Sequence, residues 1–332
     1  MIVMSEQAEK LLPVTIVSGF LGSGKTTLLK RILAANGRYG RIAIIENELG
    51  EVPIDDSLLG TGAPARLDVV LGRSCCETRG AFMKLLNGVA ESSEKYDRLI
   101  IESTGVAHPG MMAYFILSDP RLTVFMNVDG IVTLVDAQNF EKHLGGDGHA
   151  REQVAYADVV IVNKCDLVTP EKIDKVLEKL CSINSAANYL KCKNAEVDLN
   201  EILNVGGFNF KRIEQSVDGC MGGATGRRIC PEHAPHEIQT VAIQTEDSYT
   251  ANVLYAWLEE YVLRHSENIF RAKGVVSLSG VEERFIFQGV HDQFNAALGN
   301  SWKNEKRVTK MIFIGRNLQK EEILSGLARC KA

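Results

Sequence analysis

Near the start of the chain, a lysine and a threonine follow three glycines at a spacing that suits phosphate binding. Residues 19–27 read Gly-Phe-Leu-Gly-Ser-Gly-Lys-Thr-Thr and fit the pattern G-x-x-x-x-G-K-S/T. The glycines let backbone N–H groups turn inward around a phosphate chain. Lys25 would then reach the β- and γ-phosphates of a nucleotide, and the Thr26 hydroxyl would hold Mg²⁺. The predicted phosphate contacts are Gly19, Gly22, Ser23, Gly24, Lys25, Thr26 and Thr27.

The segments on either side of this loop predict the elements that would hold it. Residues 14–17 are short, largely apolar and β-branched, which predicts a buried strand. Residues 27–35 carry apolar side chains at helical spacing, which predicts an amphipathic helix. The loop therefore precedes a helix N-terminus, whose partial positive charge favours a bound phosphate.

A second predicted strand, residues 97–102, ends in a carboxylate and is followed by Ser-Thr-Gly. Glu102 at this position would bind Mg²⁺ directly or through water, and the Gly105 backbone would approach the γ-phosphate because glycine has no Cβ. Lys25, Thr26 and Glu102 are therefore the predicted catalytic residues. An ordinary strand end is the alternative reading of Glu102.

The sequence Asn163-Lys164-x-Asp166 directly follows a buried-strand pattern at residues 158–162 and predicts guanine selection. A carboxylate such as Asp166 accepts both the N1–H and the 2-amino group of guanine, whereas adenine would leave it unpaired. The apolar stem of Lys164 would cover the base, and Asn163 would tie this loop to the phosphate loop. Residues 185–186 are a weaker candidate for a backbone N–H to the guanine O6.

Strand patterns alternate with helical stretches through the first two thirds of the chain. Buried-strand candidates at residues 41–45, 97–102, 130–136 and 158–162 predict a parallel sheet with helices on both faces. In such a sheet ligands bind at the carboxyl ends of the strands, where the motifs above fall.

Two further groups of residues are candidate metal ligands. The acidic loop at residues 46–55 includes Glu48, and its carboxylates would bind Mg²⁺, water or a second metal, or be simply solvated. Cys75 and Cys76 would bind a soft metal as thiolates, with Glu48 as an outside ligand, or be packed or reactive thiols. Cys230, His233 and His236 would bind a metal only loosely.

Composition limits the remaining classes of function. The 332 residues suit about two domains, and the net charge of −5 argues against a nucleic-acid partner. No signal-peptide core or membrane-length apolar run is present, so we expect no membrane association and a cytoplasmic or organelle-matrix location. Because such compartments keep thiols reduced, the eight cysteines indicate thiols or metal ligands rather than a disulfide framework.

A stretch rich in Gly, Pro, Arg and His at residues 219–236 predicts a flexible connector. We therefore divide the chain into a nucleotide-binding domain at residues 1–215, a linker at 216–237 and a second domain at 238–332. The second domain is predicted to be small and α+β, with strands at residues 237–245, 275–278, 284–290 and 309–315 and helices at 251–263 and 321–327.

Taken together, these motifs resemble the CobW-like family of P-loop GTPases. The matching stretches are residues 13–27, 47–51, 101–109, 135–137, 157–167 and 270–274. The resemblance implies a P-loop NTPase sheet, GTP and Mg²⁺ as ligands, and slow GTP hydrolysis. It also implies delivery of a divalent metal such as Zn²⁺ or Co²⁺ to a client metalloprotein or a metallocofactor-assembly protein, with a homodimer left open.

Two positions depart from that family. Where the family usually carries C-x-C-C, this chain has Arg73-Ser74-Cys75-Cys76, and arginine cannot ligate a metal. This substitution motivates a second hypothesis, a GTP-dependent protein chaperone or switch without metal binding; a small-molecule P-loop kinase is a weaker third. His108 stands where the family tends to have Asp, and we interpret it as a hydrogen-bonded structural histidine rather than a ligand.

Overall fold

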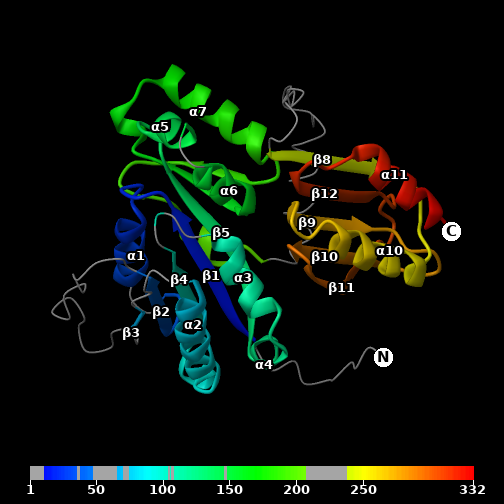
Figure 1. The fold of residues 1–332 in the computed structure, drawn as a ribbon, viewed down its shortest axis with the longest axis horizontal. Helices are drawn as coiled ribbons and strands as arrows, with labels where there is room; N and C mark the ends of the chain where they lie inside the picture. The colour runs from blue at the N-terminus through cyan, green and yellow to red at the C-terminus, as the bar shows by residue number, and fades with distance from the viewer. Residues whose placement is uncertain are drawn as a thin grey trace.

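The computed structural model describes residues 11–35, 38–47, 66–69, 75–103, 105, 108–145, 148–206 and 238–332. For residues 46–47, 66–69 and 75–79 it describes the backbone alone. Glu48, most of the acidic loop at residues 46–55, and the predicted linker at 216–237 lie outside the described residues. Within the described residues the chain forms two sheets that lie side by side (Figure 1).

The first sheet has seven strands in the order β3-β2-β4-β1-β5-β6-β7, and every neighbouring pair is parallel. Its strands are β1 (Leu12–Gly19), β2 (Ile42–Asn47), β3 (Arg66–Val69), β4 (Arg98–Glu102), β5 (Met126–Asp136), β6 (Val159–Asn163) and β7 (Asn188–Lys191). Because all of them run the same way, their carboxyl ends meet at one edge. This edge holds Gly19, Glu102, Asp136 and Asn163.

Helices cover both faces of this sheet. Because successive residues of a strand point to opposite faces, neighbouring residues of β1 pack against different helices. Ile16 belongs to an apolar cluster with α2, α3, α6 and α7, and Val17 to a second cluster with α1 and α8. The described helices of this part are α1 (Lys25–Ala34), α2 (Cys75–Ala90), η2 (Ser93–Lys95), α3 (Pro109–Leu117), α4 (Pro120–Thr123), α5 (Phe140–Leu144), α6 (His149–Tyr156), η3 (Cys165–Leu167), α7 (Pro170–Ile183) and α8 (Asn200–Leu203). The predicted α/β fold class is confirmed.

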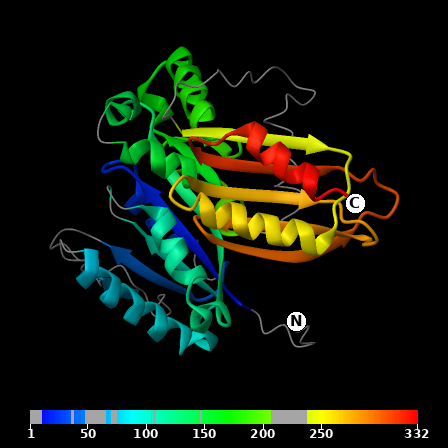
Figure 2. The ribbon, with the colours of Figure 1, turned by 45° about the vertical axis from the view of Figure 1, so that its right-hand side comes forward.

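The second sheet is antiparallel, in the order β11-β10-β9-β12-β8. Its elements are β8 (Ile238–Thr245), α10 (Ala251–Arg264), β9 (Ile269–Val276), β10 (Glu283–Val290), β11 (Gln293–Ser301), β12 (Thr309–Arg316) and α11 (Lys320–Arg329). Helices α10 and α11 cover one face of the sheet (Figure 2), where Trp257 and Tyr261 are buried. The small α+β domain is therefore present as predicted.

Two strands of this sheet differ from the prediction. The strand predicted at residues 275–278 overlaps only the last two residues of β9, which runs from Ile269 to Val276. Strand β11 was missed because it is a mostly exposed edge strand whose sequence, QFNAALGNS, lacks apolar alternation.

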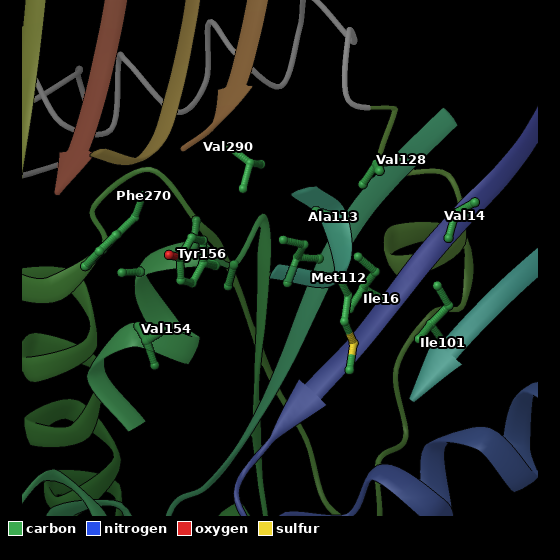
Figure 3. Packing of buried hydrophobic residues seen from close by; sticks show 14 of the residues in the cluster. Val14, Ile16, Ile101, Met112, Ala113, Val128, Val154, Tyr156, Phe270 and Val290 are labelled. Atoms are coloured by element: carbon green, nitrogen blue, oxygen red, sulfur yellow. The ribbon is translucent and has the colours of Figure 1, made fainter. Parts of the chain in front are cut away.

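The other face of the antiparallel sheet packs directly on the first domain. Phe270 and Val290 belong to the same apolar cluster as Met112 and Tyr156 of the nucleotide-binding domain (Figure 3). The Tyr156 hydroxyl also lies 2.8 Å from Nε2 of His291. The two domains therefore share a core. Among the described residues, no helix has both the length and the apolar character needed to span a membrane.

Candidate nucleotide-binding site

The phosphate loop connects the end of β1 to the start of α1 and needs glycine at two crowded positions. Gly19 and Gly24 have φ angles of 141° and 109°. A Cβ on Gly19 would lie 2.4 Å from the Leu134 carbonyl oxygen, and one on Gly24 would lie 2.4 Å from Nδ2 of Asn163. A side chain at either position would push the loop away from β5 and β6.

Lys25 is the first residue of α1 and points back into this loop. Its side chain is buried, and its ammonium donates to the carbonyl oxygens of Gly19 at 2.8 Å and Phe20 at 3.3 Å. A positive charge is therefore held inside the glycine-rich turn, beside the helix N-terminus. Thr26 follows in the first turn and is partly exposed, and Thr27 is exposed.

Three serine hydroxyls around the loop have no hydrogen-bond partner among the described residues. They belong to Ser18 in β1, Ser23 in the loop and Ser103 just after β4, and all three are buried. Buried polar atoms are normally satisfied, so a cluster of unsatisfied hydroxyls indicates a polar ligand. Together with the Lys25 ammonium, this donor set fits the phosphates of a nucleoside triphosphate.

The segment after β4 lies against the phosphate loop. Glu102 ends β4, is 4% exposed, and is paired in register with Val17 of β1. A Cβ on Gly105 would lie 2.8 Å from the Leu21 backbone nitrogen. The Gly105 carbonyl oxygen accepts a hydrogen bond from Nε2 of Gln153 in α6 at 3.0 Å. This contact makes Gln153 a positioning residue that the sequence motifs did not reveal.

Asn163, the last residue of β6, joins three loops. Its Nδ2 donates to the Ser23 carbonyl oxygen at 2.9 Å, which is the predicted tie between base loop and phosphate loop. Its Oδ1 accepts from the Ala195 backbone N–H at 2.9 Å. One buried amide therefore sets the phosphate-binding and base-binding segments relative to each other.

The residues after Asn163 form the rest of the predicted base site. Lys164 has a φ of 61°, and its ammonium lies 2.8 Å from Oδ2 of Asp136 at the end of β5. Burial raises the pKa of the Asp136 carboxyl, but hydrogen bonds from Lys164, Asn139 and Gln138 lower it by more, so the net pKa is below its ordinary value. Asp166 lies in η3 with its carboxylate exposed and therefore accessible to a base.

The weaker prediction for residues 185–186 is wrong. They precede β7, whose first residue Asn188 pairs with Val159 at the start of β6, so they lie at the opposite edge of the sheet. The Ala186 N–H is also already bonded to Oδ1 of Asn184 at 3.1 Å. Residues 192–195, which follow β7, lie at the correct edge, and the Cys192 carbonyl accepts from the Cys165 N–H at 3.0 Å. Their sequence, CKNA, carries no motif that would have predicted this placement.

The predicted metal ligands are only partly described. Cys75 and Cys76 begin α2, but their side chains lie outside what the structure describes, as does Glu48. His108 lies at the N-cap of α3, with its Nδ1 2.8 Å from Oε2 of Glu152. The predicted polar contact of His108 is thus present.

Comparison with known proteins places this geometry in a family. The nucleotide-binding domain of the CobW/HypB/UreG family matches residues 13–191, and the C-terminal domain of the cobalamin synthesis protein cobW matches residues 238–331. The zinc chaperone YjiA of Escherichia coli is 31% identical over 95% of this chain and 97% of its own. The zinc-regulated GTPase metalloprotein activator 1 of Saccharomyces cerevisiae is 26% identical over 95% of this chain and 82% of its own.

Solved structures give the same result. The Zn(II)-bound YjiA GTPase from E. coli superposes with a TM-score of 0.74 at 28% identity, covering 97% of this chain and 99% of that one. Since both domains match in sequence and the whole architecture matches in structure, the chain belongs to the CobW/HypB/UreG family of nucleotide-binding proteins.

Proposed function

We propose that the protein is a GTPase that hydrolyses GTP slowly and couples its nucleotide state to the delivery of a divalent metal. The observation that carries this proposal is the position of Asn163, which joins the phosphate loop to the loop that presents Asp166. A triphosphate and a guanine base can therefore be bound by one connected frame. The names of the relatives, zinc chaperones and GTPase metalloprotein activators, support the same function.

Each residue of the frame has a proposed role in hydrolysis. Lys25 would exchange its carbonyl contacts for the β- and γ-phosphates, and Gly105 would present its backbone to the γ-phosphate. Thr26 and Glu102 would hold Mg²⁺, which neutralises charge on the phosphates. Asp166 would select guanine while Lys164 covers the base. We identify no arginine finger or catalytic glutamine among the described residues, so hydrolysis should be slow without a partner.

The metal cargo is proposed to be Zn²⁺ or Co²⁺, bound by Cys75, Cys76 and Glu48 and passed to a client metalloprotein or a metallocofactor-assembly protein. Two of the similar solved structures are described as Zn(II)-bound YjiA, one of them a variant in which one glutamate and two cysteines are replaced by alanine. Thiolates must deprotonate to bind metal, so the affinity should rise with pH.

This function can be tested by measuring Zn²⁺ affinity of the full chain with a non-hydrolysable GTP analogue and with GDP. The proposal predicts different affinities in the two states, and it predicts that Cys75→Ser/Cys76→Ser weakens the nucleotide-dependent component. Equal affinities in the two states would contradict the coupling.

Arg73 supports one alternative, a GTP-dependent protein chaperone or switch that does not bind metal through these thiols. If the double cysteine variant activated its partner normally, that alternative would be favoured. Transfer of the γ-phosphate to a metabolite in preference to water would instead favour a small-molecule kinase.

We also propose the division into residues 1–215, 216–237 and 238–332, which the start of the antiparallel sheet at Ile238 supports. A homodimer, the absence of nucleic-acid and membrane partners, and a cytoplasmic or organelle-matrix location stay predictions.

A further inference from the structure

Two histidines and a glutamate gather outside the nucleotide site. His149 and Glu152 are three residues apart on α6, so they share one face of the helix. His108 reaches them from the N-cap of α3. One potential ligand atom from each of the three side chains lies within 4.8 Å of the other two.

We propose that His108, His149 and Glu152 bind one divalent transition-metal ion, of the class of Zn²⁺ or Co²⁺. Two imidazole nitrogens and one carboxylate oxygen are a ligand set that suits such borderline ions and disfavours Mg²⁺ and Ca²⁺, which prefer oxygen alone. This assignment revises the interpretation of His108 as purely structural. None of the three residues belongs to the phosphate loop, the base loop or the cysteine pair.

The observed geometry is close to what an ion needs. Ligands at about 2.1 Å from a tetrahedral ion are about 3.4 Å apart. The ligand atoms of the cluster all lie within 4.8 Å of one another, so no pair would have to close by more than about 1.4 Å. His108 Nδ1 and Glu152 Oε2 are already 2.8 Å apart, and the His108 and His149 rings meet edge to face with centroids 5.0 Å apart. Small rotations of two side chains at the ends of helices would suffice.

Solvent access favours exchange of the ion. The His108 side chain is 41% exposed, while that of Glu152 is 15% exposed. Sites with three protein ligands keep an open position for water or an incoming ligand, in contrast to closed four-ligand structural sites. The cluster therefore suits an ion that is loaded and passed on.

Arg316 at the end of β12 supports Glu152 from the second domain. Its Nη2 donates to Oε1 of Glu152 at 2.6 Å, while Oε2 faces His108, so the ion would take the place of the proton between Oε2 and His108 Nδ1. A partner of this kind orients a metal-binding carboxylate. Its positive charge also weakens cation binding, so glutamine, which removes the charge but keeps an N–H donor, should tighten the affinity.

The location connects the ion to both domains. Gln153, the neighbour of Glu152, donates to the Gly105 carbonyl, and Gly105 lies against the phosphate loop. An ion here would join the segment after β4, helix α6 and the antiparallel sheet. Binding of the ion does not depend on the proposed GTPase function, because it can be measured without nucleotide.

The test uses the full chain carrying Cys75→Ser/Cys76→Ser, so that thiolate binding by this pair is removed. Co²⁺ is titrated without nucleotide, and its ligand-field spectrum and stoichiometry are recorded, with Zn²⁺ competition as a second readout. We expect a site with no thiolate-to-cobalt charge-transfer band. His108→Asn and His149→Asn, each added to this background, should lower the stoichiometry by one ion or weaken the site at least ~10-fold.

A matched control is available in the second domain. His265 Nε2 lies 3.1 Å from Oε1 of Glu322, a similar histidine–carboxylate pair. No second histidine completes a three-ligand cluster there among the described residues. His265→Asn should change Co²⁺ affinity less than twofold. Circular dichroism and thermal unfolding check that each variant is folded.

The proposal is overturned if the two cluster variants bind Co²⁺ as the Cys75→Ser/Cys76→Ser parent does, or if that parent binds none. If either His108→Asn or His149→Asn fails to fold, the Co²⁺ affinity of the other variant is compared with that of the His265→Asn control. Arg316→Gln, which should bind more tightly, gives an independent readout that a merely structural role for the cluster would not move.

Discussion

The two ends of strand β6 carry buried polar residues with different functions. At the carboxyl end, the neutral amide of Asn163 joins the phosphate loop and residues 192–195. At the amino end, the Asp158 carboxylate forms buried ion pairs with Arg271 and Lys273 of β9 in the second domain. It also accepts from the Ile131 N–H at 2.8 Å. One end thus joins the loops of the candidate nucleotide site, and the other attaches a domain.

The contrast shows where charge can be used inside this protein. The neutral Asn163 amide holds two loops together and adds no charge next to the predicted phosphate position. A carboxylate can be fully buried where two cations and a backbone N–H compensate it. The two ends should therefore respond differently to substitution, with binding altered at one and folding stability at the other.

The largest effect is expected at the domain junction. Asp158→Ala leaves the Arg271 guanidinium buried without its carboxylate, which should lower the free energy of unfolding by about 3–5 kcal/mol. Denaturant titration measures the loss. The exposed pair Glu260–Arg264 is a control, since Glu260→Ala should cost less than about 0.5 kcal/mol. A loss at Asp158 no larger than at Glu260 would contradict the assigned role.

The same carboxylate predicts a pH dependence. Burial raises the pKa of Asp158, but the charges of Arg271 and Lys273 lower it by more, so the net pKa lies well below its ordinary value. A depressed pKa stabilises the fold above the unfolded pKa, about 3.9, and this contribution is lost as the pH falls towards the folded pKa. The stability difference between wild type and Asp158→Ala should therefore be constant above about pH 5 and shrink below about pH 4.

At the other end of β6, Asp166→Ala should weaken GTP binding by about 2–3 kcal/mol, because two charge-assisted hydrogen bonds to guanine are lost. The preference for GTP over inosine triphosphate, which lacks the 2-amino group, should shrink in this variant. Calorimetry measures both. Asp174→Ala, at an exposed carboxylate on α7, is the control and should bind GTP normally. A wild-type protein that bound both nucleotides equally would argue against the base contact.

A comparison of substitutions at two glycines of the phosphate loop tests how much the close approach of Gly24 to Asn163 matters. Gly22 and Gly24 both have positive φ angles, of 76° and 109°, but a Cβ on Gly22 meets no atom within 4 Å. Gly24→Ala should therefore weaken GTP binding by about 1–2 kcal/mol more than Gly22→Ala, which adds backbone strain alone. Similar losses in the two variants would show that the crowding against Asn163 is unimportant.

The smallest effect is expected for Tyr156→Phe. Loss of the hydrogen bond between the Tyr156 hydroxyl and His291 should lower the free energy of unfolding by about 1 kcal/mol, while the apolar packing between the domains stays. Thermal or denaturant unfolding detects this. A loss as large as that of Asp158→Ala would mean that the junction depends on this bond rather than on the ion pairs.

Sequence alone predicted which residues meet at the carboxyl end of β6, because the motifs there are contiguous. Residues 19–27, Glu102 and the Asn163–Asp166 segment each occupy a strand end, and parallel strands bring such ends together. The contact between Asn163 and Ser23 followed from that arrangement.

The domain end was not predictable in the same way. Asp158 and Arg271 are 113 residues apart, and the sequence around either residue does not indicate which residue it pairs with. The cluster of His108, His149 and Glu152 was missed for the same reason, since His108 and Glu152 meet only after α3 and α6 pack together. Residues 192–195 and β11 were missed because neither carries a motif or an apolar alternation.

The central claim is that this edge of the sheet binds guanine nucleotides. The most direct measurement is calorimetric titration of the full chain with Mg²⁺-GTP and with Mg²⁺-ATP under identical conditions. We expect saturable GTP binding at least about 100-fold tighter than ATP binding, because only guanine satisfies Asp166. Equal affinities for the two nucleotides, or no binding of either, would contradict it.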